Sequence, residues 1–288
     1  MLLARERLQR AGIPSDEAAL DARLLAQHVL GWDAARLLAS VAEPPSEGFE
    51  VRLDTLVTRR SKREPLAYII GTKEFFGLDF VVSSAVLIPR PETELLVETA
   101  AAVGAGEIVR IADVCSGSGC VAVALARALP RARFVATDSS RDALTLARVN
   151  ADRHGVGPRI EFLHTDLLQE TKGSFDMIVS NPPYVPARDR ETLQPEVRDF
   201  EPSLALFGGP SGLSVIGRLI EQSTERLRRG GLLMFEFGAD QEPAVRQLIS
   251  MSGGLTMMDL KRDLRGIPRV AVARRADKMP IGVEASPS

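Results

Sequence analysis

Cysteine is scarce in this sequence: the only two are Cys115 and Cys120. Neither a disulfide framework nor a zinc cluster can be built from them alone, so we expect no metal site and two small buried apolar side chains. Long apolar runs are also missing, because no stretch reaches the roughly 20 residues that span a membrane. The N-terminal region, with Arg5, Glu6 and Arg7, is too charged for a signal peptide. A cytoplasmic protein without a membrane partner is therefore expected.

A strong net charge is the third absence, since the formal net charge is −2. This value argues against a protein whose main task is gripping a phosphate backbone, and no direct nucleic-acid partner is expected. The composition is that of a soluble globular protein, with 45% hydrophobic and 26% charged residues. The 288 residues are enough for two domains.

The N-terminal quarter of the chain, residues 1–73, is predicted to be a helical domain. Leu20, Leu24 and Val29 recur at helical spacing, and Pro44 followed by Pro45 breaks the pattern. Such a domain could be a small bundle that packs its apolar stripe internally, or a module that docks a macromolecular partner. We favour substrate docking and keep the simpler bundle as the alternative.

Residues 74–90 change character and are predicted to form a β-hairpin linker, because they are aromatic and β-branched around a glycine turn. Pro89 and Pro91 fix the path of the chain at its end. They could simply make a stiff linker before the next helix. Their stiffness could also hold Arg90 and Glu92 at a binding site.

The remainder, residues 91–276, alternates strands and helices and predicts an α/β domain. We expect a doubly wound, mostly parallel, seven-stranded Rossmann-like sheet, with the last two strands forming an antiparallel hairpin at its edge. The tail, 277–288, is small and polar and is expected to be disordered. The expected strands are 108–114, 134–136, 160–163, 175–180, 232–237, 255–260 and 269–273, and the main helices 119–129, 141–154, 213–229 and 241–251.

The turn after the first of these strands is rich in glycine. Gly117 and Gly119, followed by Asp138 at the end of the next strand, fit the dinucleotide-binding fingerprint. A nicotinamide-dependent oxidoreductase or a nucleoside-binding module without activity would fit it too. Asp113 favours another cofactor, because an acid just before the turn would repel a pyrophosphate but help to hold an ammonium group. S-adenosyl-L-methionine carries an amino acid and no phosphate.

The rest of that turn and a third strand end complete the expected cofactor site. Cys115, Ser116 and Ser118 lie between Asp113 and the helix start, where backbone amides point toward a ligand. Asp166 and Leu167 follow the third strand, where an adenine could lie. Asp166 could equally be an ordinary turn residue.

A rigid loop, Asn181-Pro182-Pro183-Tyr184, follows the fourth strand. In a doubly wound sheet the first and fourth strands are neighbours, about 4.8 Å apart, and ligands bind at their carboxyl ends. Gly117 and Asn181 should therefore line one crevice. Without that partner, the loop would be read only as a turn.

The loop suits a planar NH2 group, whose nitrogen is a poor nucleophile because its lone pair is delocalised. The Asn181 side-chain oxygen and the Pro182 carbonyl could each accept one N–H, orient the nitrogen and stabilise its developing positive charge. Tyr184 could lie against the flat face of the substrate. The proton would be lost to water after transfer.

These motifs resemble those of amino-group methyltransferases that use S-adenosylmethionine. Further segments make the chain similar, over about residues 15–275, to the bacterial peptide-chain release factor glutamine methyltransferases. They are Glu64-Pro65-Leu66-Ala67-Tyr68-Ile69-Ile70-Gly71, Glu74-Phe75-Phe76-Gly77-Leu78, Ile88-Pro89-Arg90-Pro91-Glu92-Thr93-Glu94, Glu201-Pro202-Ser203-Leu204-Ala205-Leu206 and Asp263-Leu264-x-Gly266-x-Pro268-Arg269.

The resemblance implies methylation of N5 of the glutamine in the Gly-Gly-Gln motif of release factors, with S-adenosyl-L-homocysteine as the second product. It implies that Asp138 binds the ribose and that the Gly117 turn binds the methionine part. It also implies that Asn181 lies near both cofactor and substrate, as a cofactor-binding and a substrate-binding residue, and that the loop to Tyr184, including Pro183, surrounds the glutamine amide. Release factors are thus the expected partners. We expect the chain itself to be a monomer.

Three residues depart from the family pattern. Cys115 stands where glycine is frequent, Leu167 where an aromatic residue is common, and Phe207 where the family has a polar residue.

The strongest rival with the same chemistry is a nucleic-acid adenine methyltransferase, which shares the Asn181 motif. Base flipping needs a basic channel, and the near-neutral N-terminal segment offers none.

Overall fold

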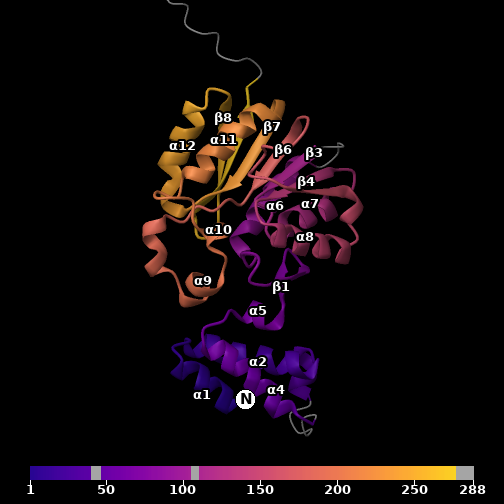
Figure 1. Cartoon of the computed structure of the whole chain (residues 1–288), viewed down its shortest axis with the longest axis vertical. Helices are drawn as coiled ribbons and strands as arrows, with labels where there is room; N and C mark the ends of the chain where they lie inside the picture. Colours follow the sequence, from indigo (N-terminus) through magenta and orange to yellow (C-terminus); the bar gives the residue numbers. More distant parts are fainter. Residues whose placement is uncertain (40–46, 105–109, 277–288) are drawn as a thin grey trace, which may run out of the picture. The chain divides into compact units, whose positions relative to one another are not determined.

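The computed structural model of the chain describes residues 1–39, 47–104 and 110–276 (Figure 1). The expected break at Pro44 and Pro45, the first residues of the strand predicted over 108–114, and the tail 277–288 lie outside the described residues. By its internal contacts the chain divides into two compact units. One comprises Met1–Thr72 and Leu193–Phe200, and the other Lys73–Thr192 and Glu201–Ser288. Within the described ranges no helix combines the length and apolar character that a membrane crossing needs.

The first unit is helical and has its own core. Leu8, Leu25 and Val57 are buried together where its helices meet, as the helical spacing predicts. Gly31 ends the longest helix in the left-handed conformation, with a φ of 66°. The helices are α1 (Leu2–Arg10), α2 (Ser15–Leu30), α3 (Ala34–Ala39), α4 (Phe49–Ser61), α5 (Leu66–Ile70) and α9 (Pro195–Phe200).

A buried arginine holds this unit together. The Arg60 side chain is 2% exposed, and its guanidinium donates to Asp21 Oδ2 at 2.6 Å, Glu196 Oε1 at 2.8 Å and Glu17 Oε1 at 2.8 Å. Burial lowers the pKa of Arg60, but the hydrogen bonds to Glu196 and Asp21 outweigh it and leave the pKa above its ordinary value. Arg63 also donates to Glu196, at 2.6 Å. These bonds incorporate α9, a segment far along the chain, into the helical unit.

The second unit contains a small hairpin and the large α/β sheet. The hairpin, β1 (Thr72–Phe75) with β2 (Leu78–Val81), overlaps only the first part of the range predicted, 74–90, because residues 82–90 form no strand. The other elements are α6 (Pro91–Gly104), β3 (Arg110–Val114), α7 (Cys120–Ala128), β4 (Arg133–Asp138), α8 (Arg141–Arg153), η1 (Gly157–Arg159), β5 (Ile160–His164), β6 (Phe175–Ser180), η2 (Ala187–Thr192), α10 (Ser203–Leu206), α11 (Ser214–Arg226), β7 (Leu227–Glu236), η3 (Ala239–Gln241), α12 (Glu242–Met251), β8 (Leu255–Arg262) and β9 (Pro268–Arg275).

The large sheet has the strand order β5-β4-β3-β6-β7-β9-β8. The strands from β5 to β7 are parallel, and β9 runs antiparallel to both of its neighbours. The predicted doubly wound sheet with an antiparallel edge hairpin is confirmed. The first and fourth strands of the pattern, β3 and β6, are neighbours in register, with Val114 opposite Ser180.

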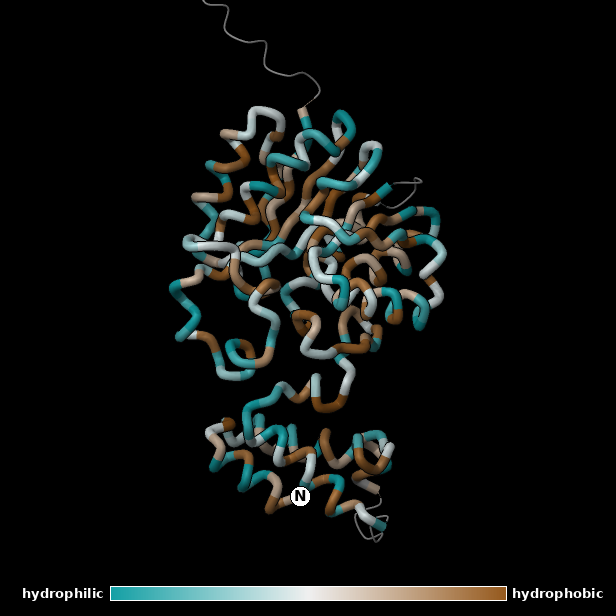
Figure 2. Tube along the Cα trace, viewed as in Figure 1, coloured by the Kyte–Doolittle hydropathy of each residue, from teal (hydrophilic) through white to brown (hydrophobic). Residues whose placement is uncertain are grey.

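Each face of the sheet is covered by its own set of helices (Figure 1). Ile111 of β3 packs in one cluster with residues of α6 and α7, whereas the next residue, Ala112, packs in a second cluster with residues of α11 and α12. This alternation follows from the two-residue period of a strand. In Figure 2 the strands are brown along much of their length, as expected for strands buried on both faces.

One predicted helix boundary is wrong. The helix expected over 213–229 ends at Arg226, and Leu227 begins β7 opposite Phe175 of β6. The sequence beyond Arg226 is still compatible with helical spacing. Leu227 is nevertheless buried as the first residue of β7, paired with β6. The short helices α9 and α10 and the turn η2 were not predicted, since six or fewer residues carry too weak a periodic signal.

Replacing Arg60 by Ala should destabilise the helical unit by about 3–5 kcal/mol, because three carboxylates would lose a buried partner. Arg59→Ala is the matched control, because Arg59 pairs with Glu64 while its side chain is 42% exposed, and should cost less than about 1 kcal/mol. Hydrogen exchange of the α2 and α4 amides in the full chain measures both effects. Equal losses in the two variants would contradict the assigned role of Arg60.

Candidate functional site

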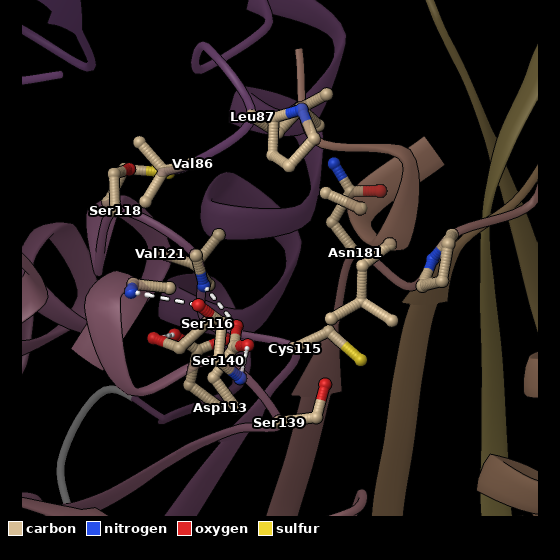
Figure 3. A pocket seen from close by; sticks show the side chains of 18 of the residues that line it. Val86, Leu87, Asp113, Cys115, Ser116, Ser118, Val121, Ser139, Ser140 and Asn181 are labelled. Atoms are coloured by element: carbon tan, nitrogen blue, oxygen red, sulfur yellow. Dashed lines mark hydrogen bonds between the residues drawn. The ribbon is translucent and has the colours of Figure 1, made fainter. Parts of the chain in front are cut away.

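A cavity of about 430 Å³ lies at the carboxyl ends of the strands of the second unit. Figure 3 shows Cys115 and Asn181 extending into it from neighbouring strand ends. The lining residues come from the segment before α6, the first turns of α6, α7 and α8, the ends of β3, β4, β5 and β6, the α10 region and α11. They are Ala85, Val86, Leu87, Pro89, Arg90, Thr93, Asp113, Cys115, Ser116, Gly117, Ser118, Cys120, Val121, Asp138, Ser139, Ser140, Ala143, Asp166, Leu167, Asn181, Pro183, Pro202, Leu204, Ala205, Phe207, Val215 and Arg218.

Most of the residues predicted to bind ligands meet in this cavity. Four do not line it: Glu92, Gly119, Pro182 and Tyr184. Glu92 lies 3.8 Å from the Arg265 guanidinium. Gly119 packs against Ala147 of α8, and Tyr184 packs against the core of the second unit. The predicted residues that line the cavity are Arg90, Asp113, Cys115, Ser116, Gly117, Ser118, Asp138, Asp166, Leu167, Asn181 and Pro183.

The turn from β3 to α7 bends sharply, through three residues with positive φ. Cys115, Gly117 and Gly119 have φ values of 59°, 56° and 79°, a region that is costly for any residue with a Cβ. A Cβ on Gly117 would meet nothing within 4 Å, whereas one on Gly119 would lie 3.0 Å from the Ala147 Cβ of α8. Gly117 therefore leaves space open, and Gly119 permits close packing of the helices.

Asp113 is buried beneath this turn. Its Oδ2 accepts from the Ser116 hydroxyl at 2.6 Å and from the Ala122 amide at 3.2 Å. Burial raises the pKa of Asp113 to about 7. A cation bound beside Asp113 would favour its ionised form.

Asp138 ties the second strand to the same turn. Its two carboxylate oxygens accept from the Gly117 amide at 2.9 Å and the Ser140 amide at 2.8 Å. Burial raises the pKa of Asp138. The carboxylate thus holds the turn and also lines the cavity.

Two further features mark the end of the cavity at β5. Leu167 has a φ of 53°, so this position, like Cys115, holds a side chain in a left-handed conformation. Asp166 is paired with Arg218 of α11. Both members of that pair line the cavity.

Ser180 joins the ends of the two central strands. Its hydroxyl donates to the Val114 carbonyl at 2.7 Å. The next residue, Asn181, donates from Nδ2 to the Thr93 hydroxyl oxygen at 2.9 Å. Asn181 therefore begins the loop at a fixed position beside the glycine turn.

The loop is held from its other side by the segment after α10. Val185 and Phe207 form a parallel bridge, and the Gly208 amide donates to the Val185 carbonyl at 3.0 Å. A Cβ on Gly208 would lie 2.4 Å from the Pro183 carbonyl oxygen. Gln241 donates to the Tyr184 carbonyl at 2.9 Å. The backbone of the loop thus has little freedom to move.

Tyr184 points away from the cavity. Its ring packs against the α11 and α12 side of the core, and its hydroxyl donates to Glu236 Oε1 at 2.9 Å. Burial raises the pKa of Tyr184 above its ordinary value. The position against the substrate proposed for this ring is not the one seen here.

Sequence reasoning missed Thr93 and Glu236. The Thr93 hydroxyl donates to Glu236 Oε2 at 2.7 Å, and Glu236 is 1% exposed. The sequence does contain a signal for Glu236, which lies between Phe235 and Phe237 at the end of a buried strand. An acidic side chain buried there needs a hydrogen-bond partner.

An ion pair braces the segment before α6. Arg90 donates to Glu201 Oε1 at 2.6 Å, and the Ile88 amide donates to Glu201 Oε2 at 3.2 Å. Burial raises the pKa of Glu201. Arg90, which we predicted to contact the substrate, is thus held at the cavity wall by Glu201. Glu201 is the first residue of the segment 201–206 quoted above.

Comparison with known proteins finds two family models along the chain. Residues 2–71 match the model of the PrmC N-terminal domain, and residues 91–196 match the model of the methyltransferase small domain. A release factor glutamine methyltransferase of Geobacter sulfurreducens is 42% identical over 260 residues, which cover 90% of this chain and 90% of that protein. One of Koribacter versatilis is 41% identical over 275 residues, or 94% of this chain and 96% of that protein.

Solved structures share the fold. A methyltransferase from Pyrococcus furiosus superposes with a TM-score of 0.54 at 17% identity, covering 76% of this chain and 98% of that one.

Gly208→Ala should displace the loop, because the new Cβ would lie 2.4 Å from the Pro183 oxygen and 2.5 Å from the Gly212 oxygen. We expect a loss of about 1–3 kcal/mol in the free energy of unfolding, with faster hydrogen exchange at the Val185 amide. Gly217→Ala in α11 is the control, since its new Cβ would meet only Leu248 at 3.9 Å, and alanine favours a helix by about 1 kcal/mol. A neutral Gly208→Ala would contradict the tight packing of the loop.

Proposed function

The chain belongs to the family of release factor glutamine methyltransferases, and on that premise we propose that it methylates N5 of the glutamine in the Gly-Gly-Gln motif of release factors. The methyl donor is S-adenosyl-L-methionine. One observation carries the proposal: β3 and β6 are neighbours, so the glycine turn and Asn181 line the same cavity.

The residues at the β3 and β4 ends of the cavity fit the donor. Open space faces Gly117, and the buried Ser118 hydroxyl, 2% exposed, lacks a hydrogen-bond partner among the described residues. We assign the amino-acid part to Asp113 and the turn Cys115–Gly119. We assign the ribose hydroxyls to Asp138, which can accept hydrogen bonds.

The adenine is assigned to the end of the cavity at β5. Leu167 supplies an apolar surface there, and Asp166 supplies an acceptor for an exocyclic N–H. Arg218 must share Asp166 with the base or release it. No phosphate group has to be accommodated, which agrees with the carboxylates that surround the turn.

Asn181 and Pro182 act on the substrate amide. When bound, S-adenosylmethionine supplies an electrophilic methyl group. Asn181 Oδ1 and the Pro182 carbonyl each accept one N–H of the glutamine amide, which orients its nitrogen and stabilises positive charge as the N–C bond forms. Methyl transfer would leave the electron pair of the S–C bond on sulfur, giving S-adenosyl-L-homocysteine, and the substrate nitrogen would then lose one proton to water.

Other parts of the chain have supporting roles in this proposal. Pro183 and Tyr184 keep the loop in place, while Arg90 and Glu92 border the path of the substrate chain. The helical unit docks the release factor. We further propose that the chain acts in the cytoplasm, as a monomer and without direct nucleic-acid contact.

The test is incubation of the chain with S-adenosylmethionine and a release factor, followed by fragment mass spectrometry. We expect one added methyl group, on the glutamine of the Gly-Gly-Gln motif. A release factor variant with that glutamine replaced should accept none. An unmodified glutamine, with label taken up instead by DNA or ribosomal RNA, would overturn the proposal in favour of a nucleic-acid methyltransferase.

Asn181→Ala should lower the transfer rate by about 100-fold or more, because the variant loses an acceptor that contacts the reacting group. Cofactor affinity should change by less than about fivefold. Single-turnover rates and calorimetric titration with S-adenosyl-L-homocysteine separate the two quantities. Equal losses in rate and affinity would instead assign Asn181 to cofactor binding.

A further inference from the structure

Glu236, at the end of β7, is a buried carboxylate with two hydroxyl partners. Thr93 donates to Oε2 at 2.7 Å and Tyr184 donates to Oε1 at 2.9 Å. Burial raises the pKa of Glu236, whereas the hydrogen bonds from Thr93 and Tyr184 favour its ionised form, in which a carboxylate accepts hydrogen bonds and donates none. Both hydroxyl protons are therefore directed at Glu236.

This arrangement decides whether the Thr93 hydroxyl donates a hydrogen bond to Asn181 or accepts one from it. A threonine hydroxyl has one proton, and that proton is directed at Glu236, so its oxygen can only accept from Asn181. Asn181 Nδ2 does donate to this oxygen, at 2.9 Å. The NH2 end of the amide is thus held by Thr93, and Oδ1 is the opposite end.

The direction of the amide matters because its two ends have almost the same shape. Only hydrogen bonds determine whether oxygen or NH2 faces a substrate. An exposed Oδ1 accepts an N–H, whereas an exposed NH2 would compete with the substrate as a donor. Asn181 lines the cavity together with Thr93, so its orientation is presented directly to a ligand.

We propose that Glu236, acting through Thr93, is a positioning residue that holds Asn181 with Oδ1 available to accept an N–H of the substrate amide. The inference rests on the proposed function and adds two residues to it. Burying a carboxylate is unfavourable unless it is hydrogen-bonded, and here both bonds lead to the Asn181–Tyr184 loop. The arrangement favours an amide, which donates N–H, over a carboxylate, which Oδ1 repels.

The chain offers a matched pair of threonines on one helix. Thr93 and Thr99 both lie on α6, but the Thr99 hydroxyl donates to the Leu95 carbonyl of its own helix, at 2.7 Å. Thr93→Val should lower kcat by about 100-fold, with cofactor affinity within about threefold. Thr93→Ser should restore most of the rate, and Thr99→Val should match the wild type.

Glu236→Gln tests the other link. A glutamine offers one acceptor oxygen and one NH2, so it cannot accept from both hydroxyls. We expect kcat to fall by about 10- to 100-fold. Because the three residues act as one unit, Thr93→Val should add nothing to Asn181→Ala in the double variant. Fully additive losses would show that Thr93 acts independently of Asn181.

A measurement without turnover tests the orientation itself. The sequence contains two asparagines, Asn150 and Asn181, so selective 15N-asparagine labelling gives two side-chain NH2 signals. Asn150 donates to the Val81 and Ser118 carbonyls and serves as the internal reference. Thr93→Val and Glu236→Gln should shift the Asn181 signal and leave Asn150 unchanged, while Thr99→Val shifts neither.

The outcomes separate this inference from the function on which it rests. A wild-type chain that fails to methylate any release factor refutes the proposed function. A methylating wild type with an Asn181 signal unmoved in both variants, or with Thr93→Val as fast as Thr99→Val, refutes the positioning role alone. A shifted Asn181 signal with a slowed Thr93→Val and a rescued Thr93→Ser supports it.

Discussion

The adjacency of β3 and β6 is the constraint on which the site depends. The two strands are parallel and in register, and the Ser180 hydroxyl joins their ends by donating to the Val114 carbonyl. Each strand therefore delivers its following segment to the same edge of the sheet. One segment is the glycine turn and the other is the loop that begins at Asn181. Ligand sites of doubly wound folds lie where strand order reverses in this way.

Rigidity of the loop comes from packing rather than from its prolines alone. Gly208 and Gly212 lie so close to the loop that a Cβ on either would lie within 2.4 Å of a loop carbonyl oxygen. Gln241 holds the Tyr184 carbonyl, and Glu236 holds its hydroxyl. A loop fixed on both sides can keep acceptors in place before a substrate arrives, which is how preorganised groups lower a barrier.

The sequence was sufficient to predict the sheet, the adjacency of its central strands and most of the cavity lining. Periodicity and the two motifs carry that information locally. It was not sufficient to predict where side chains point, because tertiary contacts decide this: Tyr184 turns to Glu236, and Gly119 serves helix packing. The inclusion of α9 in the helical unit depends on Arg60 and Glu196, which are 136 positions apart.

Two of the three departures from the family pattern lie at strained backbone positions. Cys115 and Leu167 both have positive φ, so a glycine at position 115 would relieve a backbone strain that this chain tolerates. Phe207 lines the cavity, and the Arg190 Cζ atom lies over its ring, 5.6 Å from the ring centroid. Nothing in the structure explains why a polar residue should be preferred there.

The most direct test of the central claim is a crystal structure of the chain with S-adenosyl-L-homocysteine and a Gly-Gly-Gln peptide. We expect the glutamine amide nitrogen to lie about 3 Å from Asn181 Oδ1, on the side facing the cofactor sulfur, with Asn181 Nδ2 still donating to the Thr93 hydroxyl oxygen. A glutamine bound away from Asn181, or an Asn181 amide that contacts only the cofactor, would contradict it.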